Sequence, residues 1–94
     1  MQAIQCKKAY VSVNIDVDEN GAIRPRIIRW ANGAVFRIDK VLYKCRAVSK
    51  KVGGGGIRYT VLINGMESFL FHEGDKWFVE AKSFEYWKYS IRYR

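Results

Sequence analysis

Histidine, cysteine and proline are scarce in this chain of 94 residues, which holds one histidine, two cysteines and one proline. Two separated thiols and a single imidazole cannot complete a four-ligand zinc site, and no Cys-x-x-Cys pair is present. In a reducing compartment, Cys6 and Cys45 are expected to be free thiols. The composition therefore argues against a disulfide-built scaffold or a zinc module, and we expect neither a metal nor a cofactor.

Long apolar runs are also missing. No stretch approaches the roughly 20 residues that a membrane-spanning helix requires, and the N-terminus lacks the apolar segment of a secretory signal. We therefore expect a cytoplasmic protein without a membrane partner. Apolar residues still make up 49% of the chain, which suits a single domain with one modest core. That domain is expected to span residues 1–94, with a core at about residues 8–82 and a C-terminal tail at 83–94.

Acidic residues are nearly absent from the middle of the chain. Between Ala22 and Gly65, Asp39 is the only acid against ten basic residues, a net charge of +9, while the whole chain carries +8. The segments on either side are close to neutral. A concentration of this kind predicts a surface for an anionic partner.

Apolar and polar residues alternate with a period of two along most of the chain, which is typical of half-buried strands. Val11, Val13 and Ile15 show the pattern clearly. Asn32-Gly33 is a strong hairpin signal, because both residues accept the positive φ of a tight turn. The pattern predicts six strands, at residues 11–17, 23–30, 35–48, 57–63, 66–73 and 77–82.

The third of these strands is long, and its alternation changes phase. Phe36 and Ile38 set one alternation, whereas Val41 and Tyr43 continue in the other. The slip at residues 39–40 predicts a bulge or bend of the kind that small barrels use to close.

Six strands joined by tight turns predict an all-β antiparallel meander. We expect it to form a small, partly open barrel, similar in architecture to Src-homology-3-like or oligonucleotide-binding barrels. Phe84, Trp87 and Ile91 would make the tail a helix with one apolar face. Tyr89, Ile91 and Tyr93 would instead share the face of a strand.

The predicted third and fourth strands carry most of the positive charge. Where alternation holds, their basic side chains lie opposite buried neighbours and point outward, and consecutive strands are expected to pair. The alternative is a solvated face that serves solubility alone. The candidate nucleic-acid contacts are Arg37, Lys44, Arg46, Lys50, Lys51 and Arg58.

The loop between these two strands contains a run of four glycines. Successive backbone N–H groups in such a loop can bind an anion, although no Walker motif follows and a mobile hairpin tip is the alternative. The candidate anion-binding residues are Gly53, Gly54, Gly55 and Gly56.

Aromatic side chains next to cations can stack on bases. Most aromatics here fit core positions, and the exposed candidates lie in the tail: Tyr86, Trp87 and Tyr89. A tail that packs over an open end of the barrel explains them equally well.

No catalytic residues are indicated. His72 is the only histidine, and no serine or cysteine is paired with a base. Asp16 and Asp18 cluster at a turn without the spacing of a calcium loop. We expect no enzyme, and a metal-dependent hydrolase at Asp16 and Asp18 is the most distant alternative.

Several segments resemble a group of short, uncharacterised bacterial proteins, mainly from Gram-positive species. The resemblance runs from Tyr10 to Lys82 and implies a compact single-domain β fold of unknown function, with no catalytic residues to transfer. The segments are 23–25 (IRP), 30–33 (WANG), 36–42 (FRIDKVL), 52–61 (VGGGGIRYTV), 70–71 (LF) and 77–80 (WFVE).

The sequence thus predicts a non-enzymatic module that binds nucleic acid through a basic sheet face and a glycine-rich loop. Phosphate neutralisation by lysine and arginine would make the affinity fall steeply with salt and depend little on base sequence. The alternative is a protein-interaction or homo-oligomeric assembly module that uses open sheet edges and the aromatic tail.

Overall fold

The computed structural model describes residues 6–48 and 55–92. Within them the chain forms seven strands and one helix. The strands are β1 (Lys7–Val17), β2 (Ile23–Arg29), β3 (Val35–Arg37), β4 (Lys40–Val48), β5 (Gly55–Ile63), β6 (Met66–Glu73) and β7 (Lys76–Ala81), and the helix is α1 (Phe84–Arg92).

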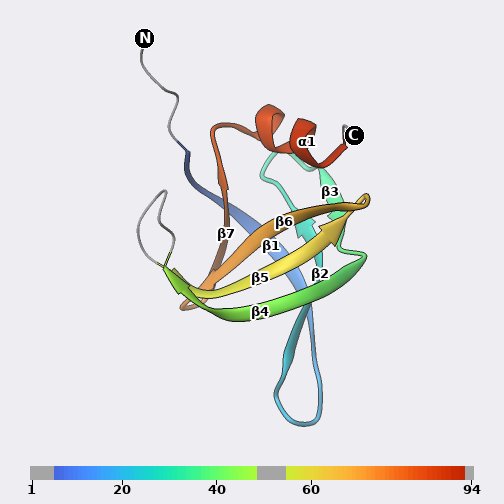
Figure 1. The fold of residues 1–94 in the computed structure, drawn as a ribbon, viewed down its shortest axis with the longest axis vertical. Coiled ribbons are helices and arrows are strands. Elements are labelled where there is room, and N and C mark those ends of the chain that lie inside the picture. The colour runs from blue at the N-terminus through green and yellow to red at the C-terminus, as the bar shows by residue number, and fades with distance from the viewer. Residues whose placement is uncertain (1–5, 49–54, 93–94) are drawn as a thin grey trace.

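All seven strands belong to one antiparallel sheet with the order β3-β2-β1-β7-β6-β5-β4. β1 lies inside the sheet and pairs with both β2 and β7, so it joins the N-terminal strands to the C-terminal ones. The sheet curls into a half-barrel, and α1 lies across one end of it (Figure 1). The predicted all-β, antiparallel, barrel-like architecture is confirmed.

The number of strands differs from the expectation, because the predicted third strand is two strands. The Ile38 N–H donates to the Arg26 carbonyl at 2.9 Å, whereas the next N–H, that of Asp39, donates to the Leu62 carbonyl at 2.8 Å. The chain therefore leaves the side of β2 and joins the side of β5 within two residues. As a result β3 pairs with β2, β4 pairs with β5, and the prediction of six strands is wrong.

A bulge in β4 lies at residue 42, two residues beyond the phase change that the sequence predicts at residues 39–40. The register with β5 shifts between Val41 and Tyr43, so Leu42 is the extra residue. Val41 still packs against the core, but Tyr43 is turned to the other face and its side chain is 61% exposed. The side chains from Tyr43 to Arg46 therefore lie on the face opposite to the one predicted.

The inner face of the half-barrel carries the core. Tyr59, Val61 and Ile63 of β5 lie at alternate positions on this face and are almost fully buried, at 3%, 0% and 1% exposure. Leu70 pairs with Tyr59 from β6 and is also buried. We call the opposite side of the sheet its outer face.

The tail forms helix α1. The sequence left a helix and a strand open for this segment, and the structure has the helix. Ser83 caps it, because its Oγ accepts the Tyr86 N–H at 3.1 Å. Trp87 and Ile91 lie one turn apart on the face that meets the sheet, and both join the core at 3% and 1% exposure. Burying each side chain contributes about 1.5–3 kcal/mol. Helix α1 is thus part of the packed domain.

Candidate nucleic-acid interface

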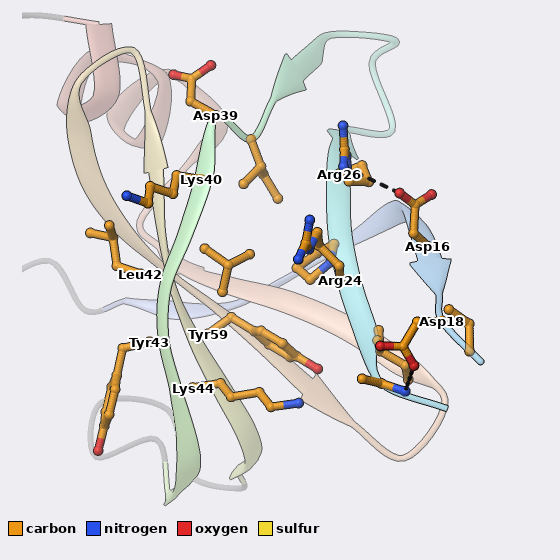
Figure 2. Close-up of a pocket in the computed structure, with 16 residues that line it drawn as sticks. Asp16, Asp18, Arg24, Arg26, Asp39, Lys40, Leu42, Tyr43, Lys44 and Tyr59 are labelled. Carbon is orange, nitrogen blue, oxygen red and sulfur yellow. Dashed lines mark hydrogen bonds and ion pairs between the residues drawn. The ribbon is translucent and has the colours of Figure 1, made fainter. Parts of the chain in front are cut away.

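The half-barrel does not close between β2 and β4, and the gap is a cleft of about 760 Å³ (Figure 2). β3 covers only the last three residues of β2, from Ile27 to Arg29. β4 is the last strand of the sheet and pairs only with β5. The β2 and β4 edges that face the cleft therefore have no partner strand in the described part of the chain.

Basic side chains from both strands line this cleft. Arg24 and Arg26 of β2 and Lys44 of β4 point toward it, whereas Lys40 of β4 borders the cleft with its backbone and directs its side chain away from the gap (Figure 2). Arg26 pairs with Asp16 across β1 and β2, at 3.3 Å between Nη1 and Oδ2. Among the described residues, the other three cations form no ion pair.

The two further acids of the cleft accept hydrogen bonds from the backbone. Asp18 Oδ1 accepts the N–H groups of Asn20 and Ala22, at 2.8 and 2.9 Å. These two bonds, with Ala22 the stronger contributor, hold the pKa of Asp18 below its ordinary value, and the nearby charge of Arg24 adds to the effect. Asp39 lies between β3 and β4, and its Oδ2 accepts the N–H of Asn64, in the β5–β6 turn, at 3.1 Å. Both carboxylates are thus committed to local turns.

Tyr59 forms the floor of the cleft. Its ring packs on Trp77, with centroids 5.5 Å apart, and Lys44 Nζ lies 5.9 Å from the Tyr59 ring centroid. The Tyr59 hydroxyl projects into the gap between β4 and β2 (Figure 2). Burial raises the pKa of this phenol, so its hydroxyl stays protonated and available as a donor.

The structure brings together only part of the basic set that the sequence singled out. Lys44 and Arg46 are both exposed and lie on the inner face, because they pair with Tyr59 and Ile57. The prediction that these two share the outward face of β5 with Arg58 is wrong. The bulge at Leu42 reverses their direction.

Arg58 and Arg37 lie on the outer face. Arg58 pairs with Cys45, whose Sγ lies 3.8 Å from Nη2, and its guanidinium carbon lies 4.5 Å from the Phe69 ring centroid. Arg37 pairs with Ile27 on β2, at the opposite edge of the sheet. Neither is among the residues that line the cleft.

The glycine-rich loop lies mostly outside the described residues, as do Lys50, Lys51, Gly53 and Gly54. Gly55 and Gly56 begin β5. Gly56 has φ +98°, and a Cβ at this position would collide with the His72 carbonyl oxygen. Its lack of a side chain therefore has a packing reason.

The aromatic residues of the tail divide into two groups. Tyr86 and Tyr89 are exposed, at 48% and 61%. Trp87 is buried against the sheet and cannot stack on a base, which corrects its assignment as a stacking residue. Lys82 Nζ lies 4.8 Å from the Tyr86 ring centroid.

A row of aromatic side chains lies on the outer face, where Phe71 and Phe78 are buried, at 2% and 0% exposure, and Tyr10 is 52% exposed; the exposure of Tyr10 was missed. Tyr10, Phe78 and Phe71 are successive cross-strand partners on β1, β7 and β6, and Arg58 continues the row on β5. The Phe71 and Phe78 rings are stacked, with centroids 4.8 Å apart. Alternation alone could have separated Phe78 from the inward Trp77 and Val79.

The cleft residues Arg24 and Tyr59 were also missed as site residues. Arg24 precedes Pro25, and the available signal was that proline, which has no backbone N–H to donate, belongs at a strand edge or an irregularity. Pro25 indeed flanks a register shift between β1 and β2. Tyr59 alternates with Val61 and therefore looks like an ordinary core residue; only the unclosed sheet makes its hydroxyl accessible.

Comparison with known proteins gives no relative: no family model, no curated protein and no solved structure matches this chain. No helix in the described segments is long and apolar enough to cross a membrane. Over residues 6–48 and 55–92, no group of three or more histidine, cysteine, aspartate or glutamate side chains is placed to hold a metal ion.

Proposed function

We propose that this protein is a non-enzymatic nucleic-acid-binding module and that the β2–β4 cleft is its binding site. The observation that carries the proposal is the placement of Arg24 and Lys44 on opposite sides of one cleft, neither in an ion pair with a described carboxylate. Cations so placed can neutralise the phosphate charge of a strand lying between them. Arg46 lies two residues beyond Lys44 on the same inner face of β4 and adds a further positive charge next to the cleft.

The fold supports the same proposal. We propose that this half-open antiparallel barrel, with basic residues lining a cleft between two open strand edges, belongs to the oligonucleotide-binding or Src-homology-3-like class. Small barrels of this kind bind single strands by combining a basic groove with aromatic side chains. Tyr43 borders the cleft, but its side chain, 61% exposed, points away from the gap (Figure 2), so the basic side chains carry the proposal.

Titration with short single-stranded and double-stranded oligonucleotides at low and high salt tests the proposal. We expect binding at low salt and a steep loss as salt rises. The double variant Arg24→Gln/Lys44→Gln should reduce the affinity by about 100-fold and lower the salt slope by about 2. Lys88→Gln on α1 removes a charge away from the cleft, where Lys88 pairs with Glu85, and should change little.

No oligonucleotide binding at low salt would refute the proposal. The predicted contribution of Lys50 and Lys51 is tested in the same assay with Lys50→Glu/Lys51→Glu, which should weaken binding if the loop takes part.

A protein-interaction module is the second candidate, and the outer face favours it. Tyr10 and Phe69 are exposed there, at 52% and 43%, close to Lys76 and Arg58 respectively. Exposed aromatic and arginine side chains are enriched at interface hot spots, and the unpaired edge of β4 can accept another strand. Salt-insensitive self-association that is lost in Phe69→Ser would support this candidate over the first.

A further inference from the structure

We propose that Lys44, the Tyr59 hydroxyl and Arg24 form a subsite that holds one phosphate of a single-stranded nucleic acid. This inference rests on the proposed function and identifies the part of the cleft that contacts the ligand. It also specifies the class of ligand as single-stranded nucleic acid, because only a single polynucleotide chain can enter the cleft.

Lys44 and Tyr59 are brought together by strand pairing. They are cross-strand partners on β4 and β5, so both side chains lie on the inner face. Lys44 Nζ lies 5.9 Å from the Tyr59 ring centroid, and the ammonium and the hydroxyl project into the same gap (Figure 2).

Arg24 reaches the gap from the opposite strand. Its guanidinium lies between β2 and β4, whereas the side chains of Lys40, Leu42 and Tyr43 point away from the gap (Figure 2). The subsite thus combines two permanent cations with one neutral donor, from three different strands. Charge-assisted bonds from lysine and arginine, together with a hydroxyl donor, are the groups that proteins use to bind phosphate oxygens.

The surroundings of the subsite suit an anion in spite of the nearby acids. Asp16 is paired with Arg26, and Asp18 is engaged by two backbone N–H groups of its own turn. Tyr59 is 3% exposed as a whole residue and its ring packs on Trp77, so its hydroxyl is presented from a rigid and largely dry floor. A donor fixed in this way loses little entropy when it binds.

The size of the cleft favours a single strand over a duplex. Its volume of about 760 Å³ falls within the range of small-molecule sites, so it can take a nucleotide or two. A duplex presents its phosphates on a wide convex surface and can reach a recessed hydroxyl only poorly. We therefore expect a single-stranded oligonucleotide to bind more tightly than a duplex of the same sequence.

Tyr59→Phe is the decisive variant, because it removes the hydroxyl and leaves a ring that can pack on Trp77. With a fluorescent oligothymidylate as the probe, Tyr59→Phe should weaken binding about 5–10-fold without changing the salt slope, since no charge is removed. Lys44→Met should weaken binding about tenfold and lower the slope by about 1. Lys40→Met is the matched control: it removes a lysine from the same strand whose side chain points away, and should weaken binding at most threefold.

The outcomes separate the subsite from the proposed function. If the wild-type protein does not bind the oligonucleotide at low salt, both fail. If it binds and Tyr59→Phe matches the wild type, or Lys40→Met matches Lys44→Met, the subsite is refuted while nucleic-acid binding stands. Competition by inorganic phosphate as strong as that by unlabelled oligonucleotide would instead indicate a site for a free anion, and a preference for duplex would also overturn the inference.

Discussion

The indole rings of Trp30 and Trp87 pack against each other with centroids 5.2 Å apart, and neither buried Nε1 has a hydrogen-bond partner among the described residues. Trp30 follows β2, and Trp87 belongs to α1. Phe36 of β3 also contacts Trp87, at 4.9 Å between centroids. The helix is therefore attached to the β2–β3 end of the sheet by aromatic packing.

Truncation of Trp87 tests this attachment. Trp87→Ala should lower the free energy of unfolding by about 3–5 kcal/mol, because it empties a site beneath the helix. Tyr86→Ala removes the neighbouring exposed ring and should cost about 0.5 kcal/mol. Urea denaturation monitored by circular dichroism measures both, and equal losses would contradict a packed helix.

Two glycines with similar positive φ separate two costs of adding a side chain: the strain of the left-handed backbone, and the collision of the new Cβ with a neighbouring atom. Gly33 has φ +92° with nothing within 4 Å of a Cβ, whereas a Cβ at Gly56 (φ +98°) would meet the His72 carbonyl. Gly33→Ala should cost about 1 kcal/mol from the left-handed conformation alone. Gly56→Ala should cost at least about 2 kcal/mol more, because β5 must move away from β6. Thermal melts of the two variants measure the difference. Similar melting temperatures would argue against a close approach of the Gly56 backbone to the His72 carbonyl.

His72 should make stability depend on pH. Its ring stacks on Trp77 at 4.0 Å between centroids, and burial lowers its pKa below 6.5, although Asp75 opposes the shift. The unfolded chain therefore binds a proton more readily, so stability is highest above the unfolded pKa and falls as the pH drops through 6.5 towards the folded pKa. Chemical denaturation at pH 7.5 and pH 5 should show this loss. His72→Phe keeps a stacked ring that cannot titrate, and it should remove this residue's share of the difference; an unchanged difference would exclude His72 as its source.

An Arg58 variant tests which surface binds the ligand: the β2–β4 cleft, or the outward basic face that alternation predicts. Arg58→Gln should lower stability by about 1 kcal/mol, because the guanidinium lies over Phe69. Its effect on oligonucleotide affinity should stay below about twofold, in contrast to Lys44→Met. A loss of affinity as large as that of the Lys44 variant would place the ligand on the outer face.

The sequence predicts the strands well because the side-chain period is local. Alternation from Val11 to Val17 is set by neighbours in the chain, and so is the turn at Asn64 and Gly65, which adopt the positive φ, 53° and 77°, of a tight turn. At the other Asn-Gly pair only Gly33 has a positive φ, 92°, so the tight turn predicted with both residues in that conformation is wrong there. Pairing is a different matter. The prediction that the third and fourth strands share one outward basic face depends on phase, and a single extra residue, Leu42, reverses it.

The site was harder to predict than the fold. Arg24 and Lys44 belong to strands that are not paired, and they face one another only because the sheet curls and stays open. Nothing in the spacing of these residues encodes that curvature. In the sequence, Tyr59 looks like its buried neighbours in β5, because it follows the same alternation. Its hydroxyl reaches solvent only through the gap between β2 and β4, and the sequence of β5 does not reveal that gap.

The position of β1 between β2 and β7 also orders events during synthesis. Strands β1–β3 can form a sheet as soon as they are made, but one side of β1 must wait for residues 77–81, with which its residues 7–11 pair. Until then the nascent chain presents an open strand edge that β7 later covers. Contacts of such long sequence separation slow folding to milliseconds or longer. The step that completes the sheet is therefore also the one that covers this open edge of β1.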